Sequence, residues 1–375
     1  MLLIHALFNE LIYVALSLGF VAIFALGAVY AERKISAFIQ DRLGPMEAGP
    51  YGAFQTLADV LKLVLKEPII PHLADRVLFV LGPAVIFISV FASYAALPLA
   101  PGLSGAETSV GLLNVLGIMA IDVIGLLMAG WGANNKYALL GAGRSVAQIV
   151  SYEIPAALAL LAAVMMYGSL SLQEISIQQG VFTPEPIYLL GVWDVSMVGG
   201  FLAWGVFRYP HLLLALLVYF IAGLAESNRA PFDIPEAESE LVSGYHVEYS
   251  GFRFALVMLS EYGKMLVVSV IATVVFLGGW NTFLPNITLG DSFSLPLADW
   301  TSGAAGTFLG VLWGSFWLLI KAGLGVGLMM WIRWTYPRVR VDQLMFVSWK
   351  VLTPLSFLLF LISGMWKLWE VYGSL

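Results

Sequence analysis

The stretch from Ala225 to Lys264 reads AESNRAPFDIPEAESELVSGYHVEYSGFRFALVMLSEYGK and lies between two long apolar segments. It contains seven carboxylates, although only 11% of all residues in the chain are charged. These acids are Glu226, Asp233, Glu236, Glu238, Glu240, Glu248 and Glu261. Pro231 and Pro235 each bias the preceding residue away from helix, so we expect most of these acids on an irregular segment.

The acids alternate with apolar side chains, which indicates a segment packed against protein. The apolar residues are Phe232, Ile234, Leu241, Val242, Tyr245, Tyr249 and Phe252. Burial and mutual repulsion disfavour full ionisation of neighbouring carboxylates, so we expect the acids to titrate as a coupled set that can pass protons. The alternative is a solvated cytoplasmic loop whose acids serve solubility.

Composition indicates an integral membrane protein, since 60% of the residues are hydrophobic and the mean hydropathy is +0.89. The chain has no cysteine, which excludes disulfides and cysteine-ligated iron–sulfur clusters within it. The four histidines are dispersed, so we expect no protein-held metal or haem. The net charge of -6 disfavours nucleic acid as a partner.

Apolar runs of about 20 residues predict eight transmembrane helices in a single membrane domain, residues 1–375. The predicted spans are 11–31, 77–97, 112–132, 152–169, 204–225, 255–277, 306–332 and 346–366. The predicted fold is therefore an all-α membrane bundle.

The distribution of Lys and Arg predicts the orientation of the bundle. Basic residues follow the first, third, fifth and seventh spans, whereas the connections 98–111, 170–203 and 278–305 contain none. The positive-inside rule then places both termini outside and the acidic stretch inside.

The inner connection 32–76 has helical periodicity of its own. Polar residues of the segment from Gly52 to Lys66 share one helical face, and apolar residues share another. The polar set is Gln55, Asp59, Lys62 and Lys66, and the apolar set is Phe54, Leu57, Leu61 and Leu65. This pattern predicts an amphipathic helix in the plane of the interface, either as a simple anchor or as the wall of a headgroup site.

Several charges fall within the predicted spans, where they are costly in lipid. They are Asp122, Glu153, Glu261, Lys264 and Lys321. Each could form a structural ion pair, but together they suggest a polar path through the bundle.

Long motifs accumulate at the inner boundaries of the spans. They include Glu32-Arg33-Lys34, Gln40-Asp41-Arg42-Leu43-Gly44-Pro45, GWGANNKYALLGAGRSVAQIVSYEIP from Gly130 to Pro155, and RWTYPRVRVDQLMFVSWK from Arg333 to Lys350. With the acidic stretch, these motifs resemble the H subunit of proton-pumping NADH:quinone oxidoreductase, respiratory complex I (the NADH dehydrogenase subunit 1 family). The outer connections 170–203 and 278–305 are longer than the family pattern, and Gly143 replaces a larger apolar residue.

The resemblance implies a non-redox-centre subunit of the oxidoreductase that forms the membrane wall of a quinone chamber. The implied quinone-binding residues are Arg33, Gln40, Arg42, Gly44, Pro45, Asp59, Lys62, Arg229, Phe232 and Arg253. Residues 225–254 would be the acidic inner loop of this chamber. Quinone would be the substrate, ubiquinone or menaquinone, and its electrons would come from an iron–sulfur cluster in an adjoining subunit.

The resemblance also implies a proton relay from the chamber toward the membrane axis. Its residues would be Glu153, Glu226, Asp233, Glu236, Glu238, Glu240, Glu248 and Glu261. The implied partners are the quinone-site subunits of the hydrophilic arm, small membrane subunits, antiporter-like subunits and membrane lipid. The implied location is the bacterial plasma membrane or an organelle inner membrane.

Two other function classes stay open. The chain could belong to a related ion-pumping hydrogenase or ferredoxin-linked complex, although the motifs around Gly244-Tyr245-His246 favour the quinone branch. A freestanding transporter would also use intramembrane acids, but we find no inverted repeat that would support it.

Overall fold

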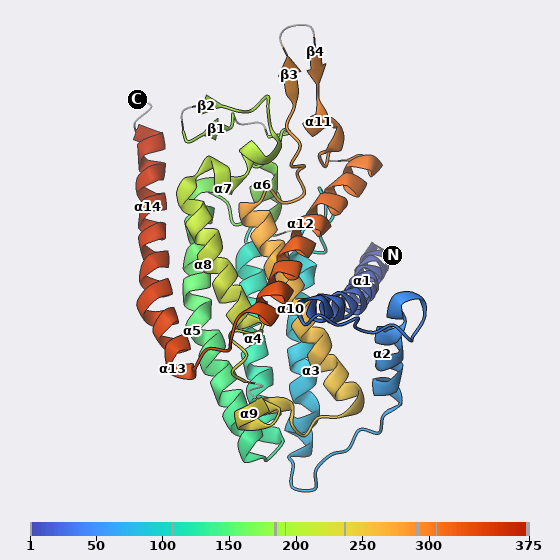
Figure 1. Ribbon diagram of the computed structural model, residues 1–375. Helices are drawn as coiled ribbons and strands as arrows, with labels where there is room; N and C mark the ends of the chain where they lie inside the picture. The colour runs from blue at the N-terminus through green and yellow to red at the C-terminus, as the bar shows by residue number, and fades with distance from the viewer. Residues whose placement is uncertain are drawn as a thin grey trace.

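The computed structural model describes residues 2–372 except 107, 184–185, 192, 236–237, 290–292 and 305; for residues 2–14, 238–239, 288–289 and 293–294 it describes the backbone alone. The chain forms a tall bundle of helices (Figure 1). In the described part, the paired strands make only two short hairpins. The predicted all-α membrane class is therefore confirmed.

Within the described residues, seven helices are long and apolar enough to cross a membrane. Six of them are α1 (Leu2–Ile39), α3 (Arg76–Ser93), α4 (Gly111–Gly132), α5 (Lys136–Tyr167), α10 (Gly251–Phe276) and α12 (Phe308–Thr335). The seventh consists of α13 (Val341–Phe346) and α14 (Thr353–Tyr372), which a π-helical turn at Val347–Leu352 joins.

The predicted count of eight spans is not confirmed. The fifth predicted span, 204–225, falls on α7 (Gly205–Arg208) and on α8 (Pro210–Glu226), an apolar helix of 17 residues. At about 1.5 Å per residue α8 is about 25 Å long, which is less than the roughly 30 Å of a bilayer core. The structure thus shows seven long helices and one shorter apolar helix in the described chain.

The predicted start of the fourth span at residue 152 is wrong, because α5 begins at Lys136. The side chain of Asn135 caps this helix by accepting a hydrogen bond from the Tyr137 N–H at 2.9 Å. The first half of α5 carries buried polar residues, so a hydropathy window does not detect it. Glu153 and Pro155 consequently lie in the middle of a 32-residue helix and not near its end.

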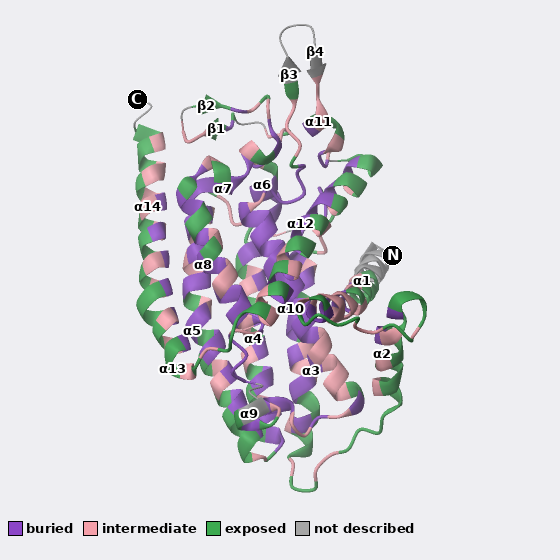
Figure 2. Cartoon of the chain, viewed as in Figure 1, coloured by how far each residue is buried: buried purple, intermediate pink, exposed green. Residues whose placement is uncertain are grey.

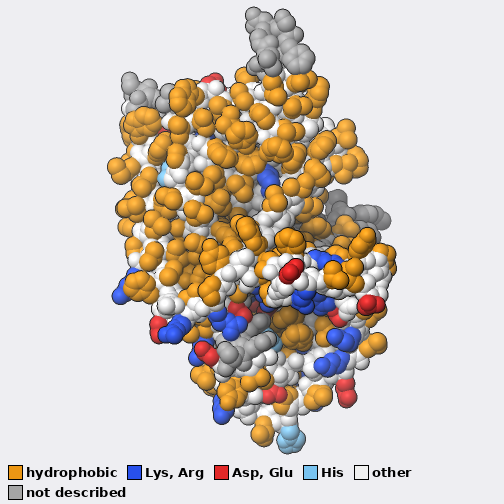
Figure 3. Space-filling view, viewed as in Figure 1, with side chains coloured by type: hydrophobic (Ala, Val, Ile, Leu, Met, Phe, Trp, Pro, Cys, Tyr) orange, Lys and Arg blue, Asp and Glu red, His pale blue; other side chains and the backbone are white. Residues whose placement is uncertain are grey.

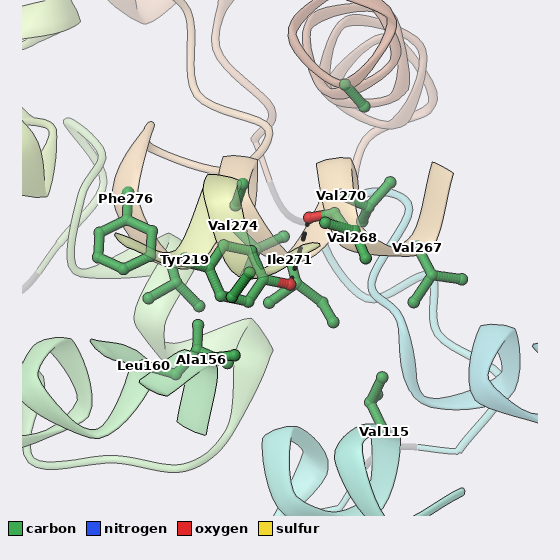
Figure 4. Close-up of a cluster of buried hydrophobic side chains, with 14 of the residues drawn as sticks. Val115, Ala156, Leu160, Tyr219, Val267, Val268, Val270, Ile271, Val274 and Phe276 are labelled. Atoms are coloured by element: carbon green, nitrogen blue, oxygen red, sulfur yellow. Dashed lines mark hydrogen bonds between the residues drawn. The ribbon is translucent and has the colours of Figure 1, made fainter. Parts of the chain in front are cut away.

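The centre of the bundle is α10, whose membrane-length segment is the most buried of the seven (Figure 2). Valines and other apolar side chains of α10 pack against α4, α5 and α8 (Figure 4). The Tyr219 hydroxyl of α8 donates a hydrogen bond to the Val268 carbonyl of α10 at 3.4 Å. A Cβ added to Gly223 of α8 would lie 2.3 Å from Val268 Cγ1, so glycine permits the close approach of these helices.

The two ends of the bundle differ in structure and in charge. The hairpins β1–β2 and β3–β4 lie at one end, and α9 lies at the opposite end (Figure 1). The short elements are β1 (Tyr188–Leu189), β2 (Trp193–Asp194), β3 (Ile287–Leu289), β4 (Phe293–Leu295), α6 (Leu172–Ile177), α9 (Glu238–Leu241) and α11 (Leu297–Thr301). Charged side chains gather toward the α9 end of the visible face, below a broad hydrophobic surface (Figure 3). This arrangement fits the predicted separation of charged and uncharged connections, while the orientation in a membrane stays a prediction.

The predicted helix of the inner connection is confirmed as α2 (Gln55–Leu65). Leu57, Leu61 and Leu65 are exposed on it, as expected for a face that contacts lipid. The connection itself is shorter than predicted at its start, because α1 continues to Ile39. The position of α2 in a membrane interface stays a prediction.

Candidate functional site

A buried carboxylate, Glu32, lies in the last third of α1 and is only 6% exposed. The Arg229 Nη1 atom lies 3.4 Å from both of its carboxylate oxygens, and the Arg333 guanidinium of α12 contacts Oε1. The Tyr262 hydroxyl of α10 donates a hydrogen bond to Oε2 at 2.6 Å. Two cations and one donor therefore offset the cost of burying this charge.

Arg229 connects Glu32 to a second buried acid. Its Nη2 atom lies 3.8 Å from Oε2 of Glu261, and its guanidinium lies 4.5 Å from the centre of the Tyr262 ring. The Tyr245 hydroxyl donates a hydrogen bond to Oε1 of Glu261 at 3.2 Å. We call Glu32, Arg229, Glu261, Arg333, Tyr245 and Tyr262 the buried charge cluster.

Gln148 of α5 fixes the backbone that carries Arg229. Its Nε2 atom donates hydrogen bonds to the carbonyls of Ala225 and Phe232, each at 2.7 Å. Asn228, the residue before Arg229, adopts a positive φ of 52°, which turns the chain away from the end of α8. The turn thereby directs Arg229 into the bundle.

A second polar group lies beside the buried charge cluster, between α1 and α2. The Arg33 Nη1 atom lies 2.6 Å from Oδ2 of Asp59, and the Lys62 ammonium lies 3.6 Å from Oδ1. Gln55 also donates a hydrogen bond to Oδ1 of Asp59, at 3.4 Å. The predicted polar face of α2 thus forms one contact network with the end of α1.

The ten residues that we predict to bind quinone lie in more than one place. Arg33, Asp59 and Lys62 contact one another. The Lys34 ammonium, next to Arg33, donates a hydrogen bond to the Pro45 carbonyl at 2.8 Å, which holds the turn at Gly44 and Pro45 against α1. Gln40 and Arg42 are exposed on the segment that follows α1.

The other three predicted quinone-binding residues come from the acidic stretch and α10. Arg229 is buried in the charge cluster, and Phe232 is buried with its ring 5.5 Å from that of Tyr152. Arg253 lies over the ring of Phe79 in α3, 5.5 Å from its centroid. The structure therefore ties Arg229 to Arg33 through the adjacent residue Glu32, and it places Arg253 against a different helix.

The acids of the irregular segment pair with separate basic or amide groups. Asp233 is buried and accepts a hydrogen bond from Arg338 at 2.8 Å. Glu240 is exposed and lies 2.6 Å from Arg144, and Glu248 accepts a hydrogen bond from Asn135 at 2.6 Å. Glu236 lies outside the described residues, as does the side chain of Glu238.

Asp233, Glu240 and Glu261 each lie beside an arginine, which offsets repulsion among the acids. Glu226, the last residue of α8, has another acid, Glu153, within electrostatic reach. The coupled titration of the acids stays a prediction. The sequence reveals the acids but not the basic residues that approach them from distant parts of the chain.

Burial affects two titratable side chains between α9 and α10. It lowers the pKa of His246, and the nearby Glu261 carboxylate opposes this shift. Burial also raises the pKa of Tyr249, against the opposing charge of Arg253. Both groups are therefore held uncharged at neutral pH.

An apolar pocket of about 380 Å³ lies between α5 and α13. It is lined by Leu139, Leu140, Gly143, Arg144, Ala147, Gln148, Ile234, Val341, Leu344 and Met345. None of the ten predicted quinone-binding residues is among these, so this pocket is not the predicted chamber. No group of three or more His, Cys, Asp or Glu side chains that could hold a metal ion occurs in the part of the chain that the structure describes.

Sequence reasoning does not reveal the central role of Glu32 in this site. A signal exists, because an acid followed by two basic residues closes a long apolar run. Tyr262 carries no signal, since a tyrosine in an apolar helix is ordinarily a packing residue. From sequence, Arg333 is one of the basic residues after the seventh span that indicate orientation, whereas in the structure its guanidinium contacts Glu32.

Together, the apolar helices and the buried charges define a multi-pass helical membrane protein with an internal polar network. Residues 12–364 match the NADH dehydrogenase family. Over 361 residues the chain is 53% identical to an H subunit of NADH-quinone oxidoreductase, numbered 2, from Cytophaga hutchinsonii, with 94% of this chain and 97% of the relative covered. The NADH-quinone oxidoreductase H subunit of Chlorobium luteolum is 52% identical over 96% of this chain and 89% of its own length. The chain belongs to the family of NADH-quinone oxidoreductase H subunits.

A relative of lower identity matches a comparable share of the chain. The NADH-quinone oxidoreductase H subunit of Geobacillus kaustophilus is 41% identical over 95% of this chain and 93% of its own length. The similarity therefore covers most of the chain and is not confined to one segment.

Proposed function

We propose that this chain is a membrane subunit of a proton-translocating NADH:quinone oxidoreductase, in which it forms part of the quinone chamber. The names of its relatives support the subunit role. The chamber wall would include Arg33, Asp59 and Lys62, which meet where the last turns of α1 contact α2. A quinone headgroup needs a few oriented polar groups beside an apolar surface for its tail, and α2 supplies both.

The observation that carries the proposal is the position of Glu32 next to Arg33. Arg33 contacts Asp59 of α2, whereas Glu32 contacts Arg229 and Arg333 inside the bundle. A change of charge at the chamber wall would thus act on the buried charge cluster through a single turn of α1. Glu32 itself is buried, so water screens its charge poorly, and it can respond to a change at the partly exposed Arg33–Asp59 pair.

The relay would begin at this cluster and continue toward the membrane axis. Glu261 shares Arg229 with Glu32, and Glu226 and Glu153 lie on helices that pack beside α10. Asp233, Glu236, Glu238, Glu240 and Glu248 would respond to quinone binding from the irregular segment. The electrons would arrive from an iron–sulfur cluster of an adjoining subunit, and the hydrophilic arm, small membrane subunits and antiporter-like subunits would be the partners.

The test is a mild-detergent purification of the tagged chain from its native membrane. We expect the chain to copurify with a large assembly that transfers electrons from NADH to a quinone analogue in an inhibitor-sensitive manner. An assembly that accepts electrons from ferredoxin or hydrogen and not from NADH would favour the alternative complexes. A chain that purifies alone, without redox partners, would overturn the proposal.

A further inference from the structure

A buried ion pair that the proposed relay does not use joins α4 to α10. The Lys264 ammonium contacts Oδ2 of Asp122, and the two residues are 4% and 2% exposed. Charges in the interior of a membrane bundle are costly and are retained mainly where they pair or act in transport. The presence of two buried charges at this contact between α4 and α10 therefore requires an explanation.

The contacts of Asp122 are incomplete. Its Oδ1 atom is buried and has no hydrogen-bond partner among the described residues, whereas Oδ2 contacts Lys264. Buried carboxylate oxygens ordinarily accept at least one hydrogen bond. The free oxygen is therefore a position at which a proton can bind without displacing an existing partner.

A third charged group, Glu226, lies within electrostatic reach of both members of the pair. The contact of Gly223 with Val268 and the hydrogen bond from Tyr219 show that α8 touches α10 here (Figure 4). The two helices run in opposite directions (Figure 1). Glu226 follows Gly223 by about one turn and Lys264 precedes Val268 by about one turn, so both lie toward the same end of the bundle.

We propose that Lys264 is a switch that alternates between Asp122 and Glu226 and thereby moves a proton between the two carboxyl groups. In the first state Glu226 is protonated and Lys264 pairs with the Asp122 carboxylate. In the second state the O–H bond of Glu226 is broken, the proton is bound at Oδ1 of Asp122, and Lys264 pairs with the Glu226 carboxylate. Lys264 keeps its own proton, so the three groups have zero net charge in both states.

The side chains suit this exchange. The flexible four-carbon stem of lysine lets its ammonium move between two acceptors, unlike the planar guanidinium of an arginine. On the C-terminal side of Lys264, α10 continues with buried residues from Met265 to Phe276, all apolar except Ser269 and Thr273. Several of them, such as Val268 and Ile271, are drawn in Figure 4. The proton would therefore pass sideways from α8 to α4 and not onward along α10. This inference rests on the proposed function, because it adds a lateral step to the proton relay.

The alternative is an ion pair that only stabilises the contact of α4 with α10. The two explanations differ in what happens when both charges are removed together. Breaking a buried pair at one member leaves an unpaired charge, whereas replacing both members by neutral groups of similar shape is often nearly neutral for stability. A structural pair therefore tolerates double neutralisation without loss of function, and a switch does not.

The experiment compares Asp122→Asn/Lys264→Gln with wild type and with Glu226→Gln, as complete complexes in inverted membrane vesicles. NADH oxidation through quinone and quenching of a pH-gradient dye are measured on the same vesicles, and complex content is measured on native gels. We expect the double variant to assemble and to reduce quinone in an inhibitor-sensitive manner, but to lose at least about half of the proton uptake per NADH. Lys264→Arg, which keeps the charge, should also lower this ratio.

Full proton uptake per NADH in the double variant would overturn the switch. If Glu226→Gln lost proton uptake in the same vesicles, the proposed function would stand and only the switch would fail. If the double variant and Glu226→Gln both showed wild-type proton uptake per NADH, Glu226 would not belong to the relay either. A double variant that does not assemble would show that the pair is needed for packing. In that case Lys264→Arg decides, because a wild-type proton uptake per NADH in this variant would overturn the switch.

Discussion

Glu32 and Arg33 are consecutive residues of α1, yet their side chains contact different parts of the molecule. Glu32 contacts Arg229 and Arg333 in the bundle, and Arg33 lies 2.6 Å from Asp59 of α2. The end of α1 therefore connects a partly exposed polar group to a buried one. This connection is the structural basis for coupling between the chamber wall and the buried charge cluster.

Glu32→Gln should destabilise the protein strongly. The substitution removes one carboxylate partner of Arg229 and leaves Arg333 beside a neutral amide, so we expect a loss of about 3–5 kcal/mol of folding stability. The measurement is the amount of assembled complex on native gels and its thermal denaturation midpoint. Glu47→Gln, at an exposed position, is the matched control and should behave as wild type.

Asp59→Asn should weaken quinone binding more than it weakens folding. Asp59 orients Arg33 and Lys62, but the pair with Arg33 is partly exposed, so its contribution to stability is about 1 kcal/mol or less. We expect a higher KM for a quinone analogue in an assembled complex. Lys66→Gln on the same segment is the control, and an unchanged KM in Asp59→Asn would remove this residue from the chamber wall.

Glu248→Gln keeps the shape of the side chain and its contact with Asn135 but removes the charge. If Glu248 belongs to the relay, quinone reduction or proton uptake will fall although the complex assembles normally. Glu240→Gln tests in the same way an exposed acid of the segment between α8 and α10. Wild-type rates of both processes would show that the relay assignment at that position is wrong.

Gln148→Leu should loosen the segment that carries Arg229. The substitution leaves the carbonyls of Ala225 and Phe232 without their common donor, at a cost of about 1–3 kcal/mol for each buried group. We expect faster proteolysis of the segment between α8 and α10 and a lower midpoint of thermal denaturation. Gln178→Leu, which removes a single hydrogen bond to the Tyr167 carbonyl, should have a smaller effect.

His246 should make the protein less stable in mild acid. Its pKa is lowered by burial in the folded state, so below the ordinary value of 6.5 the unfolded chain binds more protons than the folded chain. Stability is therefore complete above about pH 6.5 and falls as the pH decreases below it. Thermal denaturation of the complex at several pH values should show a smaller acid-induced decrease for His246→Gln than for wild type, and an equal decrease would contradict this assignment.

The sequence predicts the helices well because apolar runs and amphipathic periodicity are local properties. The helix at Gln55–Leu65 and the long spans are found in this way. The start of α5 is missed because buried polar residues such as Gln148 reduce its hydropathy, although they satisfy loop carbonyls in the fold. The fifth span is not confirmed, because the apolar run that predicts it is divided between two helices, α7 and α8.

The residue types of the site are predictable, but their pairings are not. Glu32 and Arg229 are separated by 197 positions, and Arg33 and Asp59 are on different helices. No local pattern encodes such contacts, since they depend on how α1, α10 and α12 pack. Lys264 and Asp122 are recognisable as intramembrane charges, but only the fold shows that they contact each other.

The most direct test of the account is the number of protons taken up per NADH oxidised in vesicles that contain the Glu261→Gln variant. Arg229 retains Glu32 as a partner in this variant, so the complex should assemble. The account predicts a clearly lower proton uptake per NADH than in wild-type vesicles. A wild-type ratio, at a wild-type rate of quinone reduction, would contradict the claim that the buried charge cluster couples the quinone chamber to proton translocation.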